Sequence, residues 1–230
     1  MKSSSVGRIV FGASAVLFGV IALKWYDEYT WQGLSRIWSL PFGRIAGGAL
    51  MVLQMAGGIG LQSRKTARVA AFVLGVVYGA FSLVCVLNIA NAPKEYGRYP
   101  NFFEQLCLLS AAMSFYHAAA ARSGLGVSAI SFAVTQIVYF APTIHSVPKW
   151  IPPNQRFWAI LTTAAFALAG LALLFNRQAK LAARLMAAMV ALFGVLVWIP
   201  LLVAHPEAHS NWSEFALTFL IAGASWTVAD

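Results

Sequence analysis

Long apolar runs recur from one end of the chain to the other, and short polar segments separate them. A helix of about 20 apolar residues is long enough to cross the hydrocarbon core of a bilayer. The pattern predicts eight membrane-spanning helices, at about 6–23, 45–62, 69–91, 102–120, 126–143, 157–175, 184–204 and 213–229. We therefore expect an all-α fold, a polytopic membrane helix bundle.

The composition agrees with this interpretation. Apolar residues make up 60% of the 230 residues and charged residues only 10%, whereas soluble domains carry roughly 25% charged residues. The net charge of +9 could suggest a nucleic-acid ligand. The position of the charges explains it without one, so we expect the lipid bilayer as the partner and no nucleic acid.

The connections between the predicted spans alternate in charge. One set has nine basic residues and a single acid, Asp230: Lys2, Arg8, Arg64, Lys65, Arg68, Arg122, Arg177, Lys180 and Arg184. The other set, at 24–44, 92–104, 144–156 and 205–214, mixes seven basic with six acidic residues. Short loops rich in Lys and Arg face the cytoplasm. The sequence therefore predicts that both termini are cytoplasmic.

A short motif occurs twice. The segments "WSLPFGR" (38–44) and "WIPPNQR" (150–156) align position by position, with Trp38 on Trp150 and Arg44 on Arg156, and further identities follow in the same register as far as Phe81 on Phe193. This register predicts an internal duplication, with one four-helix repeat over 1–122 and a second over 123–230. Because four spans is an even number, both repeats would enter the membrane in the same direction, as parallel repeats.

The repeated motif has the residues expected where a helix enters a bilayer. Tryptophan favours the membrane interface, proline is tolerated in a first helical turn, and Arg44 and Arg156 can extend to the headgroups. A binding role for these two arginines is the alternative.

Two acids stand at matching places in the two halves. Glu104 follows Asn101 by three residues, and Glu214 follows Asn211 in the same way. This spacing predicts a capping box at each helix start, in which the Glu side chain bonds back to the backbone. The alternative is a pair of acids that face a shared cavity.

The remaining candidates lie within or beside the spans. Cys85 and Cys107 have similar predicted depth on neighbouring helices, so they could form a redox pair or be ordinary buried residues. Tyr78, with Gln54 and Gln136, could line a cleft or simply join neighbouring helices.

Three metal-capable side chains stand together in "HPEAH" (205–209), but the proline disfavours a helical pair of histidines, and zinc needs three or four ligands in fixed geometry. We expect no metal site. The sequence assigns no catalytic or cofactor-binding residue.

The segment 147–202, "VPKWIPPNQRFWAILTTAAFALAGLALLFNRQAKLAARLMAAMVALFGVLVWIPLL", resembles the DoxX-like family of small four-span bacterial membrane proteins. The resemblance lies in the Val-Pro-x-Trp-x-Pro entry, the following Phe-Trp, and the short basic turn before an alanine-rich span. The first half resembles the family only in outline.

This resemblance implies a protein of the bacterial inner membrane that is linked to redox assemblies. Relatives include a subunit of a thiosulfate–quinone oxidoreductase and a partner of oxidative-stress enzymes. We therefore expect an accessory or non-catalytic subunit with a redox enzyme as partner and quinone as the molecule it would contact; whether the chain is itself an enzyme stays open.

The alternative function is a small-molecule carrier that uses a cleft between the repeats. A cleft lined by Tyr78, Gln54 and Gln136 would favour the carrier, whereas a closed bundle with an apolar outer groove would favour the subunit.

Overall fold

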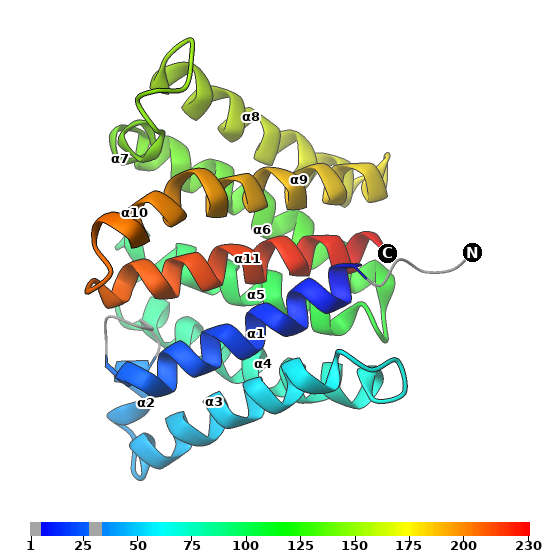
Figure 1. Ribbon diagram of the computed structural model, residues 1–230. Helices are drawn as coiled ribbons and strands as arrows, with labels where there is room; N and C mark the ends of the chain where they lie inside the picture. Colours follow the sequence, from blue (N-terminus) through cyan, green and yellow to red (C-terminus); the bar gives the residue numbers. More distant parts are fainter. Residues whose placement is uncertain (1–5, 28–33) are drawn as a thin grey trace.

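The computed structural model describes residues 6–27 and 34–230, and every regular element in these ranges is helical (Figure 1). The prediction of an all-α fold is confirmed for this part of the chain. We call the helices α1 to α5 the first half and the helices α6 to α11 the second half.

The helices follow one another with short connections. The first half contains α1 (Val6–Trp25), α2 (Leu34–Trp38), α3 (Gly43–Gly60), α4 (Ala67–Asn91), a 3-10 turn (Tyr96–Arg98) and α5 (Tyr99–Met113). The second half contains α6 (Ala118–Val138), α7 (Phe140–Ser146), α8 (Gln155–Leu174), α9 (Ala179–Phe193), a π-helical turn (Gly194–Trp198), α10 (Ile199–Ala204) and α11 (His209–Ala229).

Five helical segments are long and apolar enough to cross a membrane, which indicates a membrane protein. They are α1, α4, α6, α8 and the continuous segment Ala179–Ala204. The predicted spans that correspond to α3, α5 and α11 are not among these five, and α5 has only 15 residues.

One predicted boundary is wrong. We expected a loop at 121–125, but α5 already ends at Met113 and α6 begins at Ala118. The turn lies at 114–117, where the backbone N–H groups of Tyr116 and His117 both bond to the Met113 carbonyl. Arg122 is therefore a helical residue, because an arginine on a helix surface does not interrupt the helix.

The second wrong boundary has the same cause. We expected Arg184 in a loop before a span at 184–204, but α9 begins at Ala179, five residues earlier. The side chain of Arg184 is exposed on this helix.

The long helices pack as a closed ring. The neighbours in order are α1, α3, α4, α5, α6, α8, α9 and α11, and α11 returns to contact α1. The helices α5 and α11 also contact each other in the middle of the bundle (Figure 1). The core is made of buried side chains from both halves, among them Phe11, Leu74, Leu108 and Leu220.

The first and second long helix of each half cross at a pair of glycines. A Cβ atom on Gly58 of α3 would lie 2.5 Å from the carbonyl oxygen of Gly12 in α1. A Cβ atom on Gly170 of α8 would lie 2.9 Å from the carbonyl oxygen of Gly126 in α6. At both crossings, glycine lets the two backbones touch, as small residues do in membrane helix packing.

An arginine joins the same two helices in each half. Arg8 of α1 donates to the carbonyl of Leu61, at the end of α3. Arg122 of α6 donates to the carbonyl of Leu173 in α8, at 2.8 Å. Carbonyls at a helix C-terminus have no i+4 partner within the helix, and the Leu173 carbonyl also accepts from the backbone N–H of Asn176, at 3.2 Å.

Candidate functional site

The helices α5 and α11 bring Glu104 and Glu214 together in the middle of the bundle. Each acid lies in the second turn of its helix, and the charge of Glu214 acts on the carboxyl group of Glu104. Neither carboxylate is hydrogen-bonded to any residue that the structure describes. The two acids therefore form a pair of carboxyl groups, each influencing the ionisation of the other, across the contact between α5 and α11.

The prediction that these acids form capping boxes is wrong. The N-cap residues are Arg98 for α5 and Ala208 for α11, and neither helix has a side-chain cap. A capping box needs its Glu three residues after the N-cap, whereas Glu104 and Glu214 are six residues after it. The helices start earlier than the asparagines suggested, so both acids project from the helix wall.

Two thiols lie close to the first of these acids. The charge of Glu104 acts on both Cys85 and Cys107, and Arg36 of α2 acts on Cys85. The side chain of Ser225 in α11 lies against the Cys107 thiol. Both cysteines are free and buried, so no disulfide joins them. No sequence signal pointed to Ser225, a common small residue in an apolar run.

Tyr78 and Gln54 are buried in the core of the first half. Both are 0% exposed. The ring of Tyr78 packs 6.0 Å from that of Phe11, and the Gln54 amide donates to the Ala15 carbonyl at 3.1 Å. These contacts join α3 and α4 to α1, so the two side chains hold helices together.

The two arginines of the repeated motif are both exposed. Arg44 lies 5.3 Å from the centre of the Trp38 ring, and its carbonyl accepts a hydrogen bond from Tyr26. Trp150, which corresponds to Trp38 in the second copy of the motif, is 70% exposed. The extension of both guanidinium groups to the headgroups, and a binding role for Arg44 and Arg156, stay predictions.

The two histidines of the "HPEAH" segment pair with different acidic residues. His209 pairs with Asp27 at 2.6 Å and stacks on Trp25 with ring centres 4.5 Å apart, which joins the end of α1 to the start of α11. His205 pairs with Glu207 at 3.5 Å. In the described ranges, no three His, Cys, Asp or Glu side chains gather at one metal-sized site. Sequence reasoning missed Asp27, which is 182 residues away from its partner.

An apolar pocket opens at the surface of the second half. It has a volume of about 290 Å³ and lies between α6, α7, α8, α9 and the π-helical turn. Its walls include Trp158, Met189, Phe193 and Trp198, and the lining residue Leu192 is 55% exposed. The volume is at the small end of the range for ligand pockets. Gln136 lines it, but Tyr78 and Gln54 do not.

The π-helical turn shapes one wall of this pocket. Leu196, Val197 and Trp198 line the pocket and lie in the turn, directly before Pro200. Proline has no N–H to continue the α-helical pattern, and the N–H of Ile199 bonds instead five residues back, to Gly194. Single π-helical turns of this kind are frequent at functional sites.

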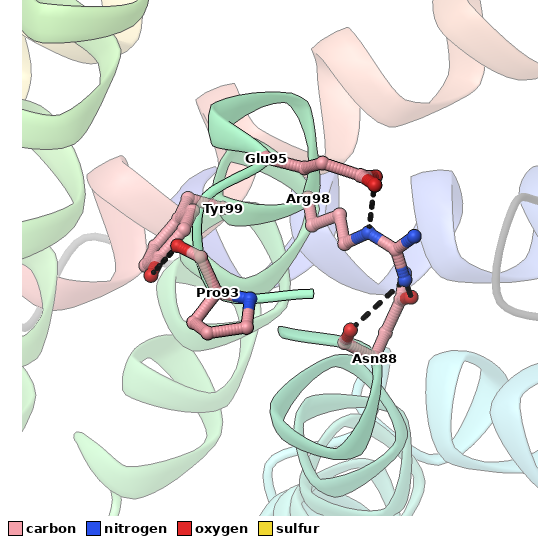
Figure 2. A network of polar contacts seen from close by, with 5 residues as sticks. All are labelled: Asn88, Pro93, Glu95, Arg98 and Tyr99. Atoms are coloured by element: carbon pink, nitrogen blue, oxygen red, sulfur yellow. Dashed lines mark hydrogen bonds and ion pairs between the residues drawn. The ribbon is translucent and has the colours of Figure 1, made fainter. Parts of the chain in front are cut away.

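The corresponding place in the first half is built differently. In the register that aligns Trp38 with Trp150, Asn88 of α4 corresponds to Pro200. Arg98 donates to the Asn88 side chain at 2.5 Å, to the Asn88 carbonyl at 3.1 Å and to Glu95 at 2.7 Å (Figure 2). This network fastens the end of α4 to the connection that follows, and α4 continues as an α-helix from Ala67 to Asn91.

The fold and these sites define a polytopic helical membrane protein with a central acid pair and a surface pocket. No family model, curated protein or solved structure matches the chain. The resemblance to the DoxX-like family therefore rests on residues 147–202 and stays a prediction.

Proposed function

We propose that this chain is an eight-span membrane protein made of two parallel four-helix repeats. The helix starts support this proposal. Val6 and Ala118, Gly43 and Gln155, and Ala67 and Ala179 each begin helices, and the members of each pair correspond in the register of the repeated motif. The turn at 114–117 is the natural boundary between the repeats, because 122 and 123 both lie inside α6.

Paired contacts give independent support for the duplication. The glycine crossings and the Arg8 and Arg122 bonds occur once in each half. Each of these contacts joins the first and second long helix of its half, as a duplicated unit would.

We further propose a location in the bacterial inner membrane with both termini in the cytoplasm. The connections from α3 to α4 and from α8 to α9 carry only basic charge, with Arg64, Lys65 and Arg177. The opposite ends of the same helices meet the mixed-charge connections. This distribution follows the positive-inside rule.

Within this architecture, the chain acts as a non-catalytic accessory subunit that holds a quinone-class molecule for a membrane-associated redox enzyme. The observation that carries the proposal is the apolar pocket of about 290 Å³ at the surface of the second half. The carrier alternative required a cleft shared by Tyr78, Gln54 and Gln136, but Tyr78 and Gln54 are 0% exposed. An outward apolar pocket suits a subunit that takes its ligand from the lipid.

Quinone titration of the purified protein in lipid nanodiscs tests this function. Quinones quench tryptophan fluorescence at short range, and Trp158 and Trp198 line the pocket. We expect saturable quenching by a short-chain ubiquinone. Met189→Phe, which fills the pocket, should weaken binding at least tenfold.

The matched control is Leu185→Phe, one helical turn away on α9 and 62% exposed, which should bind as the wild type does. Quenching that rises linearly without saturation, or that Met189→Phe leaves unchanged, would remove the support for a quinone pocket.

A further inference from the structure

We infer that Gln136 binds the polar head of the molecule in this pocket and can do so as a donor or as an acceptor. The pocket would therefore hold the oxidised and the reduced form of an aromatic dicarbonyl compound with similar affinity. The inference rests on the proposed function, because it specifies the ligand of the same pocket.

The first step concerns the polar side chains of the pocket wall. Four of them donate to backbone carbonyls close by in the sequence: Thr143 to Tyr139 at 2.9 Å, Ser146 to Pro142 at 3.0 Å, Trp158 to Pro152 at 2.8 Å and Thr162 to Ala159 at 3.2 Å. Their donors are therefore committed to the protein. The Trp198 indole can only donate a hydrogen bond. Gln136 is therefore the lining side chain that can either donate a hydrogen bond to a ligand or accept one from it.

The second step concerns how Gln136 is held. One end of its amide lies 2.8 Å from the Thr163 hydroxyl and 3.5 Å from the Thr162 hydroxyl. The Thr163 hydroxyl also lies 2.7 Å from the Ala159 carbonyl. A hydroxyl group has one proton to donate and can accept as well. The Thr163 hydroxyl can therefore donate to the Gln136 amide or to the Ala159 carbonyl, but not to both at the same time.

Two arrangements satisfy this geometry. In the first, Thr163 donates to the Gln136 oxygen, and the amide NH₂ is free to donate to a ligand carbonyl. In the second, the amide is flipped so that its oxygen and nitrogen exchange places, its NH₂ donates to Thr163, and Thr163 donates to the Ala159 carbonyl. The Gln136 oxygen is then free to accept from a ligand hydroxyl. The two amide orientations are nearly equivalent in shape, so the switch needs no movement of a helix.

The third step concerns the ligand's body. Three aromatic side chains line the pocket, Trp158, Phe193 and Trp198. Aromatic rings pack well against one another in offset or edge-to-face arrangements. A flat ring system with oxygen atoms at its edge suits this wall together with the Gln136 amide. The carbonyl form would use the first arrangement and the hydroxyl form the second.

A ligand series on the wild-type protein in nanodiscs tests the inference without any variant. The probes are 1,4-naphthoquinone, 1,4-naphthalenediol under anaerobic conditions, and naphthalene. We expect the quinone and the diol to bind within about threefold of each other. Naphthalene should bind about tenfold more weakly, since a neutral hydrogen bond contributes roughly that factor.

The variant Gln136→Met keeps the size of the side chain and removes its ability to donate or accept a hydrogen bond. It should bring all three dissociation constants to within about threefold of one another, while Gln62→Met, the same change at an exposed site on the first half, should leave the wild-type pattern intact.

The outcomes separate the two proposals. If none of the three probes binds saturably, the pocket does not hold such a ligand and the proposed function fails. If all three bind but the wild type does not favour the oxygenated probes over naphthalene, or favours one of them tenfold over the other, the role of Gln136 is wrong while the pocket stands.

Discussion

The glycine crossing between α1 and α3 allows a quantitative prediction. A Cβ atom on Gly58 would lie 2.5 Å from the Gly12 carbonyl oxygen, 2.9 Å from Val16 Cγ2 and 3.0 Å from the Val16 nitrogen. Two of these three neighbours are backbone atoms, so Gly58→Ala must push the helices apart. Overpacking of this kind costs about 1–3 kcal/mol, and the better helix propensity of alanine offsets up to about 1 kcal/mol.

We therefore expect Gly58→Ala to lower the free energy of unfolding by about 1–2 kcal/mol. For a chain of this size, that loss corresponds to a melting midpoint lower by about 2–8 °C. Gly170→Ala should cost less, because its closest neighbour is the flexible end of Ile130, at 2.7 Å. Gly79→Ala is the control: nothing lies within 4 Å of its Cβ position, so its midpoint should stay level or rise.

The chain provides its own probe for this measurement. Cys85 and Cys107 are free and buried, so a dye that fluoresces on reaction with thiols reports unfolding as the protein is heated in detergent micelles. The expected order of midpoints is Gly79→Ala highest, then Gly170→Ala, then Gly58→Ala. A Gly58→Ala midpoint equal to that of the wild type, or a Gly79→Ala loss of similar size, would refute the reasoning from backbone contact.

Three further predictions concern charges. Replacing His209 with alanine should lower the free energy of unfolding by about 0.5–1.5 kcal/mol, and His209→Ala combined with Asp27→Asn should lose less than the sum of the two single changes in the same melting assay; additive losses would contradict the pairing. Glu104→Gln should keep or raise the melting midpoint, because a neutral amide replaces an acid that lies beside a second acid, and adding Glu214→Gln should gain less than the sum of the single changes. A reporter enzyme fused after Asp230 should be active in the cytoplasm, and activity on the outer side would overturn the proposed orientation.

The helical fold could be predicted because the apolar runs are long and the breaks between them are polar. The predicted helix boundaries are wrong where a charged residue lies inside a helix and not in the connection between two helices. Arg122 suggested a loop at 121–125, but the chain turns at 114–117, where the sequence "SFYH" has no Lys, Arg, Gly or Pro. Membrane helices carry arginine near their ends, so a charge marks the membrane surface more reliably than it marks the end of a helix.

The candidate sites could be predicted only in part. The matching positions of Glu104 and Glu214 singled out both acids, but whether an acid caps a helix depends on where that helix starts, and a shift of three residues changes its role. The pocket was not predictable, since it depends on a π-helical turn and on the spacing between α8 and α9. Pro200 was a visible signal for an irregular turn, but nothing in the sequence shows which side chains border it.

The return of α11 to α1 has a consequence for how the chain could be joined. The end of α11 lies against the start of α1, since a Cβ atom on Gly7 would lie 2.5 Å from the Thr227 nitrogen. The contact between α5 and α6 occupies the matching place in the ring. A circular permutant would open the chain at the turn 114–117 and join the end of α11 to the start of α1 through a short linker. It would keep every helix contact of the ring. Such a circular permutant should fold to the same bundle, and two halves produced from separate genes should assemble into it.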